Sequence, residues 1–175
     1  MTTAQTVDAE RADLLEELGA ARQFLRFTTR DLDDEQARQR TTVSALTLGG
    51  LIKHVTSAER GWAKFIVEGQ GTMPNFAEMT PADFAKREQD FQLLPGETLQ
   101  GVLAEYAAIA TATDDLVRTL PDLNASQPLP NAPWFPPNAR WTARKVLLHI
   151  IAETTHHAGH ADIIRESLDG AKTMG

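Results

Sequence analysis

The sequence has no cysteine, and this absence limits the chemistry that its 175 residues can perform. Without thiols the chain can form no disulfide bond and can offer no thiolate to a metal ion. Any ion that it binds must therefore be held by histidine, aspartate, glutamate or water.

Long apolar runs and an excess of basic residues are also missing. No run of about 18 apolar residues exists, so the sequence predicts no membrane-spanning helix. The first 17 residues are polar and acidic, unlike a secretory signal, and we expect a cytoplasmic protein. The net charge of -7 argues against non-specific nucleic-acid binding, which needs clustered Lys and Arg.

Amphipathic helical patterns fill most of the chain instead. Apolar residues recur at three- and four-residue spacing, which predicts long helices over residues 7–30, 48–67 and 99–120. Thr142 is predicted to cap a last helix that Asp169 and Gly170 close, and Thr47 and Gly69 are predicted to bound the second. Shorter helices are expected over 35–40 and from 81 towards 95. Four long helices without a convincing strand predict one all-α domain, 1–175, folded as a four-helix bundle.

The helical periodicity also predicts which side chains are buried. On the first helix, Phe24 and Phe27 belong to the apolar stripe, whereas Arg22 belongs to the solvated face. On the last helix, Ile163 falls in or beside the predicted buried arc, and Arg165 falls outside it.

The segment 121–140 contains six of the nine prolines, together with Trp134 and Phe135, and shows no hydrophobic period. One interpretation is a stiff connector that spans the length of the bundle. Another is a lid whose aromatic side chains wall a pocket. The two interpretations are compatible.

Four of the five histidines lie in one twelve-residue stretch, 149–160, of the predicted last helix. At about 100° per residue, they share an arc of roughly 100° on the predicted buried face with one glutamate. A carboxylate buried there costs several kcal/mol unless it is protonated, paired or bound to a cation. The residues of this arc are His149, Glu153, His156, His157 and His160.

Glu153 and His157 lie one helical turn apart and can bind the same ion. His54, on the second helix, is the remaining histidine and the candidate third ligand. Two histidines and one glutamate would leave a coordination position open, as in catalytic zinc sites. The alternative is a hydrogen-bonded polar network without a metal. His160 is either a fourth ligand or a proton-transfer group, and His149 and His156 either support the ligands or simply pack.

The segments that carry these residues resemble the DinB superfamily. The run from Trp141 to Gly170, with its Glu153-Thr-Thr-His156-His157-Ala-Gly-His160 motif, looks like the last helix of these proteins, closest to actinobacterial uncharacterised members. The run Leu51-Ile-Lys-His54 to Trp62 resembles the second helix, which carries the first ligand. Many members have His-x-x-x-His on the last helix. Here Glu153 takes the first of those positions, which is similar to the His, Glu, His set of mycothiol-dependent maleylpyruvate isomerase.

The resemblance implies an up-down-down-up bundle and a divalent metal, usually zinc or nickel. It also implies that the metal activates a low-molecular-weight thiol, such as mycothiol, for S-transfer to a small electrophile or for its isomerisation. That thiol must come from outside the chain, which has no cysteine. On this interpretation Trp134 and Phe135 lie at the mouth of the thiol-binding pocket and His160 moves a proton. The alternatives are a non-catalytic metal-binding or stress-response protein and a metal-dependent hydrolase, and a homodimer is a possible assembly.

Overall fold

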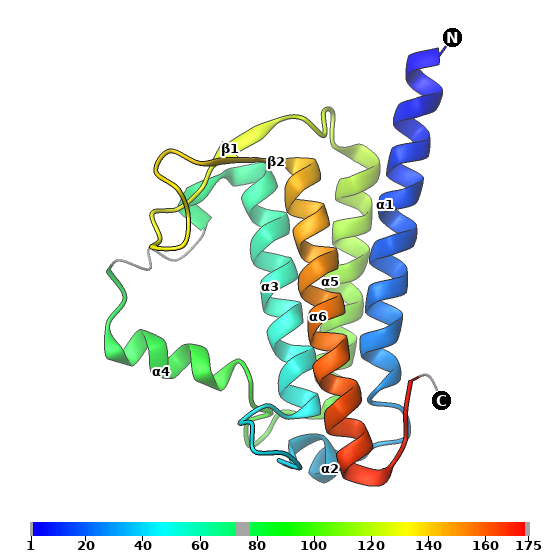
Figure 1. Ribbon diagram of the computed structural model, residues 1–175, viewed down its shortest axis with the longest axis vertical. Helices are drawn as coiled ribbons and strands as arrows, with labels where there is room; N and C mark the ends of the chain where they lie inside the picture. The colour runs from blue at the N-terminus through cyan, green and yellow to red at the C-terminus, as the bar shows by residue number, and fades with distance from the viewer. Residues whose placement is uncertain (1, 73–77, 174–175) are drawn as a thin grey trace.

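The computed structural model describes residues 2–72 and 78–173, and its four long helices form a bundle (Figure 1). An all-α four-helix bundle was predicted, and the prediction is confirmed. The small two-stranded sheet was not expected. The long helices are α1 (Thr2–Phe27), α3 (Leu48–Glu68), α5 (Leu99–Thr119) and α6 (Ala143–Asp169), and the shorter elements are α2 (Asp34–Arg38), the 3-10 helix η1 (Gln70–Thr72), α4 (Pro81–Gln89), β1 (Ser126–Pro128) and β2 (Arg140–Thr142).

The helix boundaries follow from capping residues in the sequence. The Thr47 hydroxyl accepts a hydrogen bond from the Gly50 amide, and the Thr142 hydroxyl accepts one from the Lys145 amide. Each such cap stabilises its helix by about 1 kcal/mol. Gly170 ends α6 with a φ of 79°, a conformation that glycine adopts without strain. The predicted caps of α3 and α6 are therefore confirmed.

The bundle has up-down-down-up topology, as predicted. In Figure 1, α3 and α5 run in the same direction, and α1 and α6 run opposite to both. α1 packs mainly on α6, and α3 packs on both α5 and α6. Because α3 and α5 are parallel, the chain must return along the length of the bundle after α3 before α5 can begin. The described residues of this return segment, 69–72 and 78–98, include α4, which lies on the return path (Figure 1).

The connection between α5 and α6 crosses one end of the bundle instead (Figure 1). The interpretation of 121–140 as a connector that spans the bundle's length is therefore wrong. The physical reason is that α5 and α6 are antiparallel, so the end of one lies near the start of the other. Within this connection β1 pairs antiparallel with β2, with Gln127 opposite Trp141.

The return segment contains a helix that stands away from the bundle. Every residue of α4 is exposed, and Figure 1 shows it beside α3. Its start is nevertheless well specified, because Thr80 and Asp83 form a capping box and Pro81 occupies the first helical turn. The helix ends at Gln89, earlier than predicted, because residues 90–98 form turns that carry Phe91 and Leu93 back against α3.

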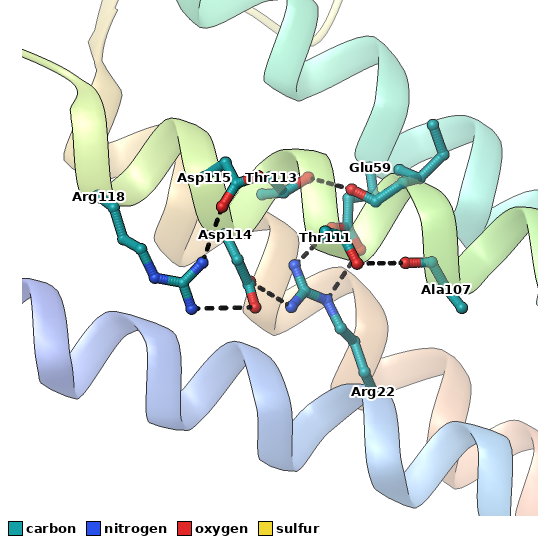
Figure 2. Close-up of polar contacts among 9 residues, drawn as sticks. Arg22, Glu59, Ala107, Thr111, Thr113, Asp114, Asp115 and Arg118 are labelled. Carbon is teal, nitrogen blue, oxygen red and sulfur yellow. Dashed lines mark hydrogen bonds and ion pairs between the residues drawn. The ribbon is translucent and has the colours of Figure 1, made fainter.

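Ionic side chains lie inside the bundle where apolar ones were expected. Arg22 of α1 donates hydrogen bonds to both carboxylate oxygens of Glu59 on α3, at 2.5 and 3.2 Å, and to Asp114 on α5 at 2.7 Å (Figure 2). Arg22 is only 6% exposed and Glu59 only 1%. The prediction that Arg22 faces solvent was wrong. Its partners lie on two other helices, so the hydrophobic periodicity of α1 alone cannot indicate them.

Arg165 of α6 is buried for a similar reason. Its guanidinium donates to the carbonyl oxygens of Thr28 and Arg30, just beyond the end of α1, and forms an ion pair with Asp169. Cationic side chains at a helix end stabilise its unpaired carbonyl groups. The prediction that Arg165 lies outside the buried face was therefore also wrong.

Three apolar residues that were expected in or beside buried faces are instead exposed: Phe24, Phe27 and Ile163. The buried line of α1 runs through Leu14, Leu18, Ala21 and Leu25, which is narrower than the apolar stripe of the sequence. No helix within the described ranges is long and apolar enough to cross a membrane.

Candidate metal centre

Two neighbouring antiparallel helices bring His54, Glu153 and His157 together. His54 comes from the first half of α3, and Glu153 and His157 lie one turn apart on α6. The Nε2 atom of His54 lies 3.4 Å from Oε1 of Glu153, and Nε2 of His157 lies 3.2 Å from the same oxygen. The three side chains are 15%, 29% and 12% exposed, so the cluster is largely buried but not sealed.

The spacing of these three groups suits a divalent cation. One ligand atom from each residue lies within 4.8 Å of the other two. In a tetrahedral zinc site with bonds of roughly 2.0–2.1 Å, neighbouring ligand atoms are roughly 3.3 Å apart. The two nitrogen-to-oxygen distances bracket that value. Imidazole nitrogen and carboxylate oxygen are also ligands that zinc and nickel accept, so the donor set fits such an ion.

Glu153 provides the negative charge of the cluster. Hydrogen bonds from His157 and then from His54 hold the pKa of its carboxyl well below the usual range, although partial burial opposes this. Glu153 is therefore ionised at neutral pH, as a metal ligand must be.

A close approach between α3 and the return segment orients His54. The His54 ring stacks on Phe91, with ring centroids 4.0 Å apart and an angle of 21° between the planes. This packing depends on Gly50, because a Cβ there would lie 1.8 Å from the Phe91 carbonyl oxygen. The role of Phe91 was missed from the sequence, since no local pattern links residue 91 to residue 54.

A cavity of about 530 Å³ opens beside the cluster. This volume lies in the range of roughly 300–1,000 Å³ typical of small-molecule sites. The cavity is lined by His54 and Glu153 of the cluster and by Trp134 and Phe135 of the α5–α6 connection. The remaining lining residues are Ser57, Ala58, Arg60, Gly61, Trp62, Lys64, Thr72, Arg87, Asp90 and His149.

Comparison with known proteins places this chain in a family. A family model described as mycothiol-S-transferase matches residues 13–170. The chain belongs to the mycothiol S-transferase family. This membership supports the DinB-superfamily assignment made from the two helical motifs.

The solved structures agree on the fold. The crystal structure of a conserved protein from Enterococcus faecalis is similar, with a TM-score of 0.63 and 16% sequence identity over 98% of this chain and 99% of that one. At this identity the likeness concerns the fold alone. No curated protein matches the chain significantly.

The remaining histidines of this mycothiol S-transferase family member occupy different environments. His149 lines the cavity, with its ring edge-on to Trp62 at 4.9 Å and close to Trp141 at 5.0 Å. Burial lowers the pKa of His149. His156 is exposed, contrary to the prediction of a buried face. The histidine arc lies roughly a quarter turn from the buried line of α6, so only part of it faces the interior.

His160 lies one turn beyond His157, with ring centroids 5.6 Å apart, and also contacts His156 at 4.6 Å. It is not among the described residues that line the cavity. Burial, followed by the neighbouring His156 and His157, lowers the pKa of His160. The sequence placed His149 and His160 on the same arc, but eleven residues at 1.5 Å each separate them by about 16 Å along α6. Of the two, His149 lines the cavity.

A second, larger groove of about 1320 Å³ lies between α1 and α5. It shares no lining residue with the cavity at His54. Arg22 and Asp114 form an ion pair there, and the groove holds no converging group of three metal-binding side chains among the described residues. The smaller cavity is therefore the candidate site.

We expect a chelator to lower the melting temperature of the metal-loaded protein by about 5–10 °C without unfolding its helices. An ion that binds only the native state stabilises it by about 2.7 kcal/mol at 100 times its dissociation constant. For a chain of this length, that free energy corresponds to the stated shift. The two apolar clusters of the bundle do not depend on the ion.

Circular dichroism at a helical wavelength, recorded during heating with and without chelator, measures both effects. The His157→Ala variant is the control and should show no chelator-dependent shift. Complete loss of helix on chelation at room temperature would contradict the expectation, because the metal would then hold the fold together.

Proposed function

We propose that the chain is a divalent-metal-dependent thiol S-transferase that joins a low-molecular-weight thiol of the mycothiol type to a small electrophile. His54, Glu153 and His157 would hold the ion, with zinc or nickel the expected metals. The observation that carries the proposal is the convergence of these three ligand atoms beside an aromatic-lined cavity of ligand size, whose lining includes His54 and Glu153. Membership of the mycothiol S-transferase family supports the choice of thiol.

A divalent cation at this position would lower the pKa of an added thiol, which is about 8.5 in the free state, so that the nucleophilic thiolate predominates at neutral pH. The protein must then orient two small molecules and remove one proton. A set of three protein ligands leaves room for an external ligand, since zinc commonly binds four ligands.

The residues around the cavity suit these tasks. Trp62, Trp134 and Phe135 present apolar surface that excludes water and holds a substrate in place. His149 is better placed than His160 to accept the thiol proton, because it lines the cavity and its lowered pKa keeps it neutral at pH 7. In the transfer, the sulfur lone pair forms the carbon–sulfur bond. The displaced leaving group departs with the electron pair of its own bond to carbon, and His149 passes its proton to solvent.

Absorption spectroscopy of the cobalt-substituted protein tests this proposal. Titration with a small neutral thiol such as 2-mercaptoethanol should produce a sulfur-to-cobalt charge-transfer band at millimolar concentrations. The band should be absent in His157→Ala and present in His156→Ala, which changes a histidine at the neighbouring exposed position. If no thiol perturbs the cobalt spectrum, the transferase proposal fails. A non-catalytic metal-binding protein or a hydrolase that uses a bound hydroxide would then take its place.

A further inference from the structure

We propose that the cavity beside the metal centre selects an electrophile that carries a carboxylate, and that Arg60 and Lys64 bind this carboxylate. The inference rests on the proposed function, because it names the chemical class of the second substrate. It comes from the charges along one face of α3, which the metal chemistry does not use.

The charge of the cavity differs in sign from that of the chain. The whole sequence has 24 acidic and 17 basic residues. Among the described lining residues the balance is reversed, with three basic side chains against two acidic ones, and one of the acidic ones is the proposed ligand Glu153. Asp90 is then the remaining carboxylate on the wall. A local excess of positive charge between apolar walls attracts anions from solution.

Two of the three positive charges, Arg60 and Lys64, follow the proposed ligand His54 along α3. His54, Ser57, Gly61 and Lys64 follow one another at three- and four-residue spacing and all line the cavity, as does Arg60. At 1.5 Å per residue, Arg60 lies about 9 Å and Lys64 about 15 Å along the helix axis from His54. The small side chains between them leave a floor on which a flat ligand can lie. A substrate that reacts near His54 can therefore place a carboxylate at Arg60 and Lys64 if a ring or an equivalent spacer separates the two groups.

Both cations are available for exchange with a ligand. Arg60 forms an ion pair with Glu105 of α5, and Lys64 forms one with Glu68 at 3.6 Å. All four side chains are about half exposed, and exposed pairs of this kind stabilise a protein by only about 0–1 kcal/mol. Neither Glu105 nor Glu68 lines the cavity. A ligand carboxylate can therefore replace either partner at small cost.

Binding of a matched acid and amide to the zinc-loaded full-length protein tests the inference without turnover. The probes are 4-methylbenzoate and 4-methylbenzamide, which have nearly the same shape and differ in charge. The readout is tryptophan fluorescence, because Trp62 and Trp134 line the cavity and the third tryptophan, Trp141, stacks on Trp62. The acid should bind about three- to tenfold more tightly than the amide.

Three variants assign the preference to residues. Arg60→Gln with Lys64→Gln should reduce the preference to about one, and Glu105→Gln should increase it about twofold by releasing Arg60. The matched control is Arg118→Gln, because Arg118 is 53% exposed against 47% for Arg60, forms a similar ion pair with Asp115, and lies outside the cavity. The control should leave the preference unchanged.

Competition with a thiol shows which substrate carries the carboxylate. If 4-methylbenzoate and 2-mercaptoethanol bind together, the carboxylate belongs to the electrophile. Displacement of one by the other would overturn that assignment, as would equal binding of acid and amide or a preference that survives in the double variant. These outcomes are distinct from a failure of the proposed function, which shows as a cobalt spectrum that no thiol changes.

Discussion

Alanine in place of His157 is expected to weaken the binding of a divalent metal more than about 100-fold. Loss of a residue that only supports a ligand typically costs 10- to 100-fold, and loss of a direct ligand costs more. His54→Ala should have an effect of the same order, because the two imidazole nitrogens lie at nearly equal distances from the shared Glu153 oxygen. Metal analysis after dialysis against a weak chelator measures the bound stoichiometry.

The chain provides two matched controls for this experiment. His156→Ala removes an exposed histidine next to His157, and His149→Ala removes a cavity histidine one turn before Glu153. Both should retain close to one ion per chain. Full retention of metal in His54→Ala and His157→Ala would exclude the proposed ligand set, and the polar-network interpretation of the histidine arc would then hold.

Alanine in place of Arg22 is expected to lower the free energy of unfolding by about 3–5 kcal/mol. Removing one partner of a buried ion pair leaves the other charge without compensation, and that cost is about this size. Here the charge left without its partner is the Glu59 carboxylate, which is 1% exposed and accepts two hydrogen bonds from Arg22 (Figure 2). Urea unfolding followed by circular dichroism measures the change.

A second variant separates lost charge compensation from lost packing. In Arg22→Met with Glu59→Leu both charges are replaced by apolar side chains, and most of the stability should return. Arg118→Ala is the surface control, since Figure 2 shows Arg118 paired with Asp114 and Asp115 on α5 alone, and its effect should be within about 0.5 kcal/mol. If Arg22→Ala is as mild as Arg118→Ala, the network does not hold α1, α3 and α5 together.

The effect of Arg22→Ala should appear in stability and not in metal binding. Arg22 does not line the cavity, and its partners Glu59 and Asp114 lie outside the ligand cluster. The two sets of variants therefore probe different parts of the molecule, and their effects should be independent of each other.

The sequence by itself determined the features that depend on neighbours a few residues away. The long helices, the Thr47 and Thr142 caps and the pairing of Glu153 with His157 all follow from helical spacing, because residues four apart on a helix always lie on one side. His54 could be chosen as their partner by elimination, since it is the one histidine outside the cluster. The up-down-down-up topology came from family resemblance and not from any local pattern.

Tertiary structure decided which side of each helix meets which neighbour. Periodicity ranks residues by hydrophobicity, so it assigned Arg22 and Arg165 to solvent and Phe24 and Phe27 to the interior. The packed bundle reverses these assignments, because carboxylates on α3 and α5 compensate Arg22, carbonyl groups just beyond α1 accept hydrogen bonds from Arg165, and α1 buries a narrower face than its apolar stripe. The stacking of Phe91 on His54 and the meeting of Trp134 and Phe135 with His149 around the cavity depend on contacts between segments distant in the chain. No local spacing records such contacts, and only the folded chain brings them together.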